Sequence, residues 1–156
     1  MPPVEFREAI PSDETVLFPM MRELAGQAPG PIPFDESALR SAFRQFLSLP
    51  AFGRIWVIYD GGAITGYVIL TVGFSFEFRG HDAFIDELYI VPAHRHRGLG
   101  RAAMAFVEQQ AGEMGVHAVH LEVDRGNDAG LELYRRSGYK DHHRLLMTKW
   151  LNRVMQ

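Results

Sequence analysis

The sequence predicts an α/β fold of the α+β type, in which one mixed sheet carries helices on both faces. Its length of 156 residues fits one domain spanning residues 1–156. Three successive strand segments joined by short turns indicate antiparallel neighbours. A strand–helix–strand unit follows them and implies a parallel crossover. The expected order is β-α-α-β-β-β-α-β-α-β-β, in which the last segment supplies one or two strands.

A strand and two helices are expected in the first third of the chain. Val4 to Ile10 alternates well enough for a half-buried strand. Pro11 to Glu14 combines a proline, a capping residue and acids, which is typical of a helix start, and this helix should stop near Gly26. After a loop rich in proline and glycine (APGPIP), a second helix should run from near Asp35 to just before Pro50.

A hairpin of two strands is expected next. Arg54 to Tyr59 and Ile64 to Phe74 read as strands, and the Asp60-Gly61-Gly62 turn between them is a strong hairpin signal. Phe74 to Phe78 continues the alternation of the second strand. The phenylalanines at 74, 76 and 78 are expected to form one face of the strand and to pack on the core. The alternative is that they form a wall of the site for the acceptor.

The centre of the chain is a strand, a short basic loop and a helix. Phe84 to Val91 is rich in β-branched, aromatic and aliphatic residues, and Pro92 ends it because proline has no N–H to donate. A helix should begin near Gly98 or Leu99, since apolar residues then recur at helical spacing.

The last third should add a strand, a short helix and the final strand or strands. His117 to Val123 is expected to be the strand after the central helix. Asn127 to Ser137 is expected to be the helix, with Gly138 as its C-terminal stop. Tyr139 to Trp150 is expected to complete the sheet.

The basic loop between the central strand and helix predicts a phosphate or pyrophosphate site. A helix start presents free backbone N–H groups and the positive end of its dipole. Gly98 and Gly100 have no Cβ, so an anion can approach the backbone, and Arg95, Arg97 and Arg101 add positive charge. Neither a P-loop nor a G-x-G-x-x-G fingerprint is present. The alternative is an ordinary tight turn with solvated arginines.

Composition narrows the classes of function. A hydrophobic content of 47% and a charged content of 22% are ordinary for a soluble globular protein, and no apolar run is long enough to span a membrane. The lack of cysteine excludes disulfides and thiolate chemistry and suits a cytoplasmic location. A net charge of −3 argues against general nucleic-acid binding. The histidines lack an H-E-x-x-H pattern, so no metal site is expected.

Two motifs resemble one known family. RHRGLG at Arg95–Gly100 is similar to the [RQ]-x-x-G-x-[GA] signature of the Gcn5-related N-acetyltransferases (GNAT). LEVDRGNDAGLELYRRSGY at Leu121–Tyr139 is similar to the second signature of that family. Both motifs stand in the family's order and spacing. The resemblance implies a GNAT-like fold, with strands splayed around the cofactor, and acetyl transfer from acetyl-CoA to a primary amine.

The resemblance also implies roles for individual positions. Leu88, Tyr89 and Ile90 match the strand that pairs with the pantetheine arm, and Asn127 matches a polar residue that touches the cofactor. The matching cradle for the pyrophosphate consists of Arg95, His96, Arg97, Gly98, Leu99, Gly100 and Arg101. Tyr134 matches the general acid of the family, with a core aromatic as the alternative.

Direct attack on a thioester needs a neutral amine, a polarised carbonyl and a protonated leaving thiolate. An alkylammonium has a pKa of about 10.4, so a base or a desolvating acidic site must remove its proton. Glu122 and Glu87 are both candidates for the base, and for each the alternative is a solvated or salt-bridged carboxylate. The phenol of Tyr134 can protonate the thiolate, and a strand N–H such as that of Ile90 can stabilise the oxyanion.

The acceptor is expected to be a cationic small-molecule amine or a peptide or protein amine. Its site should lie between residues 27–34 and 77–87, where Glu77, Asp82 and Asp86 add to the charge of Glu87. The first alternative is a non-catalytic acyl-CoA sensor, and the second is a transferase for a longer acyl group. Homodimerisation through the C-terminal strand is a further expectation from the family.

Overall fold

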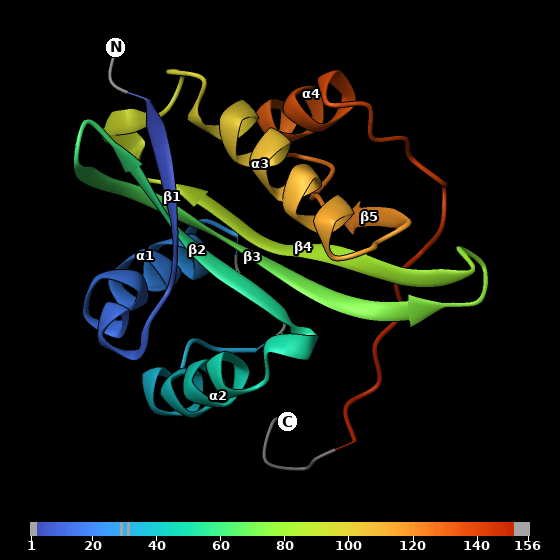
Figure 1. The fold of residues 1–156 in the computed structure, drawn as a ribbon, viewed down its shortest axis with the longest axis horizontal. Coiled ribbons are helices and arrows are strands. Elements are labelled where there is room, and N and C mark those ends of the chain that lie inside the picture. Colours follow the sequence, from blue (N-terminus) through green and yellow to red (C-terminus); the bar gives the residue numbers. More distant parts are fainter. Residues whose placement is uncertain (1–2, 29, 31, 152–156) are drawn as a thin grey trace.

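The computed structural model describes residues 3–28, 30 and 32–151. They form one mixed sheet in the order β1-β2-β3-β4-β5, with α1 and α2 on one face and α3 and α4 on the other (Figure 1). The elements are β1 (Val4–Glu8), α1 (Glu14–Gln27), α2 (Glu36–Ser48), β2 (Gly53–Asp60), β3 (Ala63–Ser75), β4 (Gly80–Ile90), α3 (Leu99–Glu113), β5 (Ala118–Leu121) and α4 (Asp128–Arg136). The predicted α/β fold with a mixed sheet is confirmed.

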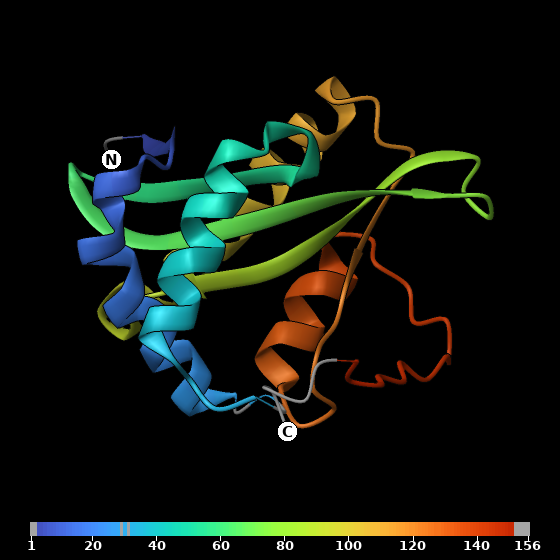
Figure 2. The same cartoon turned by 90° about the horizontal axis from the view of Figure 1, so that it is seen from below.

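Strands β1 to β4 are antiparallel neighbours, and β5 lies parallel to β4. The predicted β2–β3 turn is present, since Gly61 and Gly62 both have positive φ. The expected extension through Phe78 is wrong. Strand β3 ends at Ser75, and residues 76–79 form the turn into β4, with Arg79 at a φ of 58°. This long β3–β4 hairpin reaches beyond the helices (Figure 2).

One residue of β4 interrupts its pairing with β3. Ile69 lies opposite Glu87, but Leu70 lies opposite Ile85, so Asp86 is the extra residue of a β-bulge. A regular strand would place Ile85 and Glu87 on the same face. With the bulge, Ile85 packs against the α3 face, whereas Glu87 bonds to Tyr67 on the α1 face.

Each face of the sheet has its own apolar core. Under α1 and α2, the core includes Leu17, Phe18 and Phe43. Under α3, one helical stripe is buried, namely Leu99, Ala103, Met104, Val107 and Ala111. The apolar periodicity that predicted α3 is therefore the stripe that holds the helix to the sheet.

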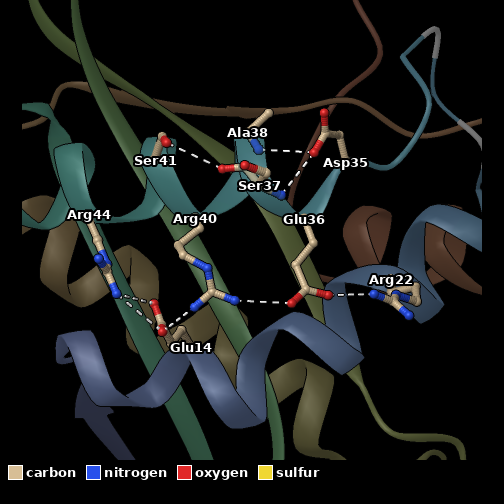
Figure 3. A network of polar contacts seen from close by, with 9 residues as sticks. All are labelled: Glu14, Arg22, Asp35, Glu36, Ser37, Ala38, Arg40, Ser41 and Arg44. Atoms are coloured by element: carbon tan, nitrogen blue, oxygen red, sulfur yellow. Dashed lines mark hydrogen bonds and ion pairs between the residues drawn. The ribbon is translucent and has the colours of Figure 1, made fainter.

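A polar network joins the two helices of the other face. Glu14 accepts hydrogen bonds from Arg40 and Arg44, and Glu36 links Arg40 to Arg22 (Figure 3). Helix α2 starts beside Asp35 as predicted, and Asp35 caps it, because its Oδ1 accepts from two backbone N–H groups at 2.9 and 3.1 Å. The network holds α2 against α1. It therefore also holds the C-terminus of α1 and the N-terminus of α2, which the loop between the two helices connects.

The expected strand or strands at residues 139–150 are wrong. The described part of this segment, up to residue 151, contains no strand, so β5 is the last strand of the sheet within the described residues. Five successive polar residues, Lys140 to Arg144, give the segment no alternating apolar face to bury. Leu145, Leu146 and Met147 follow in an unbroken run and remain exposed. Arg144 instead binds Glu77 in the hairpin turn through two contacts of 2.8 and 2.9 Å.

None of the helices in the described part of the chain has the length and apolar character that crossing a bilayer requires.

Candidate active site

The parallel strands β4 and β5 separate partway along the sheet. Their pairing runs from Asp82 opposite Ala118 to Ile85 opposite Leu121 and stops there. Strand β4 continues to Ile90 with β3 as its only strand neighbour among the described residues. Among the described residues, the edge of β4 from Asp86 to Ile90 thus has no strand neighbour on the side of β5, and we call the space beside this edge the opening. This is the splay that the predicted fold requires.

Backbone alternation shows which groups of β4 face the opening. The N–H of Val91 donates to the carbonyl oxygen of Thr65 on β3 at 2.9 Å. Successive residues of a strand point their N–H and C=O groups to opposite sides, so Leu88 and Ile90 direct theirs away from β3. The carbonyl of Ile90 accordingly accepts from Arg95 Nε at 2.8 Å. The N–H groups of Leu88 and Ile90 therefore line the opening.

Helix α3 begins beside the end of β4. Gly98 is its N-cap residue, with a φ of 82° in the left-handed region, and His96 also has a positive φ of 61°. The first intrahelical bond runs from Ala102 N–H to the carbonyl of Gly98 at 3.0 Å. By position, the N–H groups of Leu99 to Arg101 have no carbonyl earlier in the helix to bind. Free N–H groups at the positive end of a helix dipole are able to bind an anion.

Two of the three arginines near this site bind protein groups. Arg95 turns back over the ring of Tyr89 and donates to Gln27 Oε1 at 2.9 Å. Arg97 lies 3.0 Å from His94 Nδ1 and 3.4 Å from Asp60 Oδ2. These contacts tie the loop to α1 and to the end of β2. They leave the exposed Arg101 as the arginine on the first turn of α3 itself.

The two glycines of the motif differ in their surroundings. A Cβ on Gly100 would lie 3.2 Å from Leu133 Cδ2, so this glycine lets α4 pack closely on α3. A Cβ on Gly98 would meet nothing within 4 Å. Gly98 is therefore the glycine with an open side, and its positive φ is a second reason for glycine there.

Three predicted site residues lie on or near α4 and β5. Asn127 caps α4, because its Oδ1 accepts from Gly130 N–H at 2.9 Å. Tyr134 is half-buried and packs against the α3-side core that contains Ile85, and burial raises the pKa of its phenol. Glu122 is exposed directly after β5. Tyr134 thus stays protonated at neutral pH, as a proton donor must.

Glu87 has a partner that the sequence did not predict. The hydroxyl of Tyr67, on β3, donates to Glu87 Oε2 at 2.6 Å. Burial raises the pKa of the half-buried Glu87 carboxyl, and the bond from Tyr67 opposes that rise. Burial also raises the pKa of Tyr67, which therefore remains a donor. Alternation along β4 does not reveal this contact, because the bulge at Asp86 decides which face of the sheet Glu87 takes.

The acidic patch expected from residue 77 to residue 87 is smaller than predicted. Glu77 forms its ion pair with Arg144, and Asp82 lies 3.3 Å from His120 Nε2. Both of those carboxylates have cationic or protonatable partners, which leaves Asp86 and Glu87 as the acids beside the opening.

Among residues 3–28, 30 and 32–151, no three His, Asp or Glu side chains gather as metal ligands would. What the site offers is an open strand edge, a helix N-terminus, a partly buried carboxylate and a protonated phenol.

Comparison with known proteins agrees with this arrangement. The sequence model of the acetyltransferase (GNAT) family matches residues 18–139, and this chain belongs to that family. It is 24% identical over 143 residues to an aminoalkylphosphonate N-acetyltransferase of Salmonella typhimurium, covering 92% of this chain and 89% of that protein.

Solved structures share the fold. An integron cassette protein from the mobile metagenome of Cole Harbour Salt Marsh is 33% identical and superposes with a TM-score of 0.81, over 94% of this chain and 90% of that one. A predicted acetyltransferase with acetyl-CoA from Clostridium acetobutylicum is 18% identical, with a TM-score of 0.78, over 94% of this chain and 96% of that one.

Proposed function

We propose that this protein transfers an acetyl group from acetyl-CoA to a primary amine by direct attack on the thioester. The observation that carries the proposal is the unpaired edge of β4, which opens beside the N-terminus of α3. An acetyltransferase of this family needs a donor site, and this edge suits a peptide-like pantetheine arm. The N–H and C=O groups of Leu88 would bind an amide of the arm. The N–H groups of Leu99 to Arg101 would bind the pyrophosphate.

The reaction needs no covalent enzyme intermediate. The amine nitrogen attacks the carbonyl carbon, the C–S bond breaks, and Tyr134 gives its proton to the departing thiolate. The proton lost by the amine passes to Glu87 or Glu122, directly or through water. The N–H of Ile90 faces the opening and would stabilise the negative charge on the carbonyl oxygen.

The proposed acceptor is a cationic amine that enters from the side of α1 and α2. Glu87 lies on that side of the sheet, and a groove of about 560 Å³ runs between α1 and α2. Its wall carries Glu14, Glu23 and Glu36. Arg22 and Arg40 also line it and pair with Glu14 and Glu36, so Glu23 supplies the one negative charge in excess there. The aminoalkylphosphonate N-acetyltransferase relative supports a small-molecule amine as the first class to test.

A thiol-release assay with acetyl-CoA and a panel of amines tests this proposal. The panel should contain polyamines, aminoalkylphosphonates, aminoglycosides and a lysine-rich peptide. We expect turnover with one cationic class, and Tyr134→Phe should lower kcat by about 10²-fold while leaving acetyl-CoA affinity unchanged. Turnover with neutral amines alone would refute the cationic acceptor, and an unchanged kcat would remove Tyr134 as the acid.

The sensor alternative makes a different prediction for the same experiment. An acyl-CoA sensor would bind acetyl-CoA in calorimetry and release no thiol with any amine. The longer-acyl alternative is separated by repeating the assay with propionyl-CoA and longer donors. A higher kcat/KM with a longer donor would replace acetyl transfer with transfer of that acyl group.

A further inference from the structure

Tyr67 sits at the centre of the sheet, directly across from Tyr89 of β4. Tyr67 is 0% exposed and Tyr89 is 2% exposed, and their rings stack with centroids 6.0 Å apart. Such a buried cross-strand pair leaves Tyr67 little rotational freedom. The position of its hydroxyl is therefore set by the core.

The hydroxyl of Tyr67 holds the carboxyl of Glu87 at the apex of the opening. Glu87 stands two residues beyond Ile85, the last residue of β4 that pairs with β5. Tyr67 bonds to Oε2, and no hydrogen bond from another described residue to Oε1 is present. One carboxylate oxygen is thus anchored, while the other remains for a water molecule or an amine.

The groups around Glu87 have opposite effects on the pKa of its carboxyl. Burial and the neighbouring charge of Asp86 both disfavour the carboxylate form of Glu87, whereas the Tyr67 bond favours it. Across the stacked pair, the Tyr89 hydroxyl donates to Glu23 of α1, and Arg95 lies over the Tyr89 ring. Tyr67 is thus the group in contact with Glu87 that stabilises its ionised form.

We infer that Tyr67 is a positioning residue for catalysis, which orients Glu87 as the proton acceptor for the amine and keeps it ionised in a partly buried site. The inference rests on the acetyltransferase function proposed above. It also chooses between the two candidate bases, since Glu122 is exposed and no described side chain anchors it.

The test is the pH dependence of kcat/KM for Tyr67→Phe, which keeps the ring and removes the hydroxyl. Loss of a hydrogen bond to a charged group should raise the pKa of Glu87 and move the acidic limb up by about one pH unit. At a pH below the wild-type limb, kcat/KM should fall about tenfold, with an unchanged KM for acetyl-CoA. An acidic limb that stays in place would overturn the inference.

Tyr59→Phe is the matched control. The Tyr59 hydroxyl is also partly buried beside a charged group, because it accepts from Arg7 at 2.9 and 3.2 Å, but it lies on β2 away from the opening. This variant should leave the acidic limb where it is. A shift equal to that of Tyr67→Phe would show a general structural effect and would count against a specific role.

Two further measurements test the inference if the Tyr67→Phe variant does not fold or if the wild type shows no activity. If Tyr67→Phe does not fold, Glu87→Gln decides, because an unaltered acidic limb in that variant would remove the group that Tyr67 is said to orient. If the wild type acetylates no amine, the proposed function fails by itself. Carboxyl ¹³C NMR of Glu87 in the free protein then still tests the contact, and an equal Glu87 pKa in wild type and Tyr67→Phe overturns it.

Discussion

Replacement of Gly98 by alanine separates the two reasons for glycine at the start of α3. The residue has a φ of 82°, and a Cβ there would meet no atom within 4 Å. The cost to the free protein is therefore backbone strain alone. A left-handed conformation costs a residue other than glycine about 1–2 kcal/mol. For a protein of this size, that lowers Tm by roughly 2–4 °C per kcal/mol.

The same methyl group would stand on the open side of the proposed phosphate site. We expect the Kd for acetyl-CoA to rise at least tenfold, equivalent to about 1.4 kcal/mol, because the methyl keeps the pyrophosphate from the backbone N–H groups. Scanning calorimetry gives the stability change, and titration calorimetry gives Kd. Gly112→Ala is the control, since Gly112 also faces open space but has an ordinary helical φ. It should raise Tm slightly and leave Kd unchanged.

The two readouts can fail separately. A lower Tm with an unchanged Kd would refute the phosphate site and keep the conformational argument. An unchanged Tm would refute the argument from φ, since no contact of the new methyl group is available to offset the strain.

Substitutions at two other positions test contacts that stabilise the fold. Asp13 accepts from Arg7 at 2.7 and 3.0 Å, and the bond from Arg7 lowers its pKa; Asp13→Asn should cost about 2 kcal/mol near pH 7. In urea melts, this difference should shrink as the pH falls through the lowered folded pKa, where wild-type Asp13 also becomes neutral. Asn127→Ala should cost about 1 kcal/mol by uncapping α4. Asn127→Asp should restore that stability, because an aspartate side chain can accept the same hydrogen bond from Gly130 N–H.

Much of this fold is encoded locally and can be predicted for that reason. The β2–β3 turn needs residues with positive φ, and Gly61-Gly62 provides them. Asp35 precedes a helix and caps it. The strand–loop–helix unit around Gly98 has a sharp change of period, from alternation to a helical stripe, and its boundary was predicted to within a residue.

What the sequence did not reveal depends on pairing between distant segments. The contact of Tyr67 with Glu87 requires the register of β3 against β4, and that register shifts at Asp86. Arg95 and Arg97 carry the charge that the motif predicts, but their partners, Gln27 and Asp60, come from elsewhere in the chain. Similarly, Tyr139 to Trp150 did not form the predicted strand, because its polar run offers no alternating apolar face that the sheet could bury.

The bulge at Asp86 determines which face of the sheet Glu87 occupies, because it adds one residue to β4 between Ile85 and Glu87. Deleting that single residue would restore regular pairing and exchange the faces of every residue on one side of the deletion. Either the carboxylate of Glu87 would turn toward the apolar core under α3, or Ile85 would leave it. If Glu87 is the base as proposed, deletion of Asp86 should therefore abolish acetyl transfer although every residue assigned to the reaction is still present.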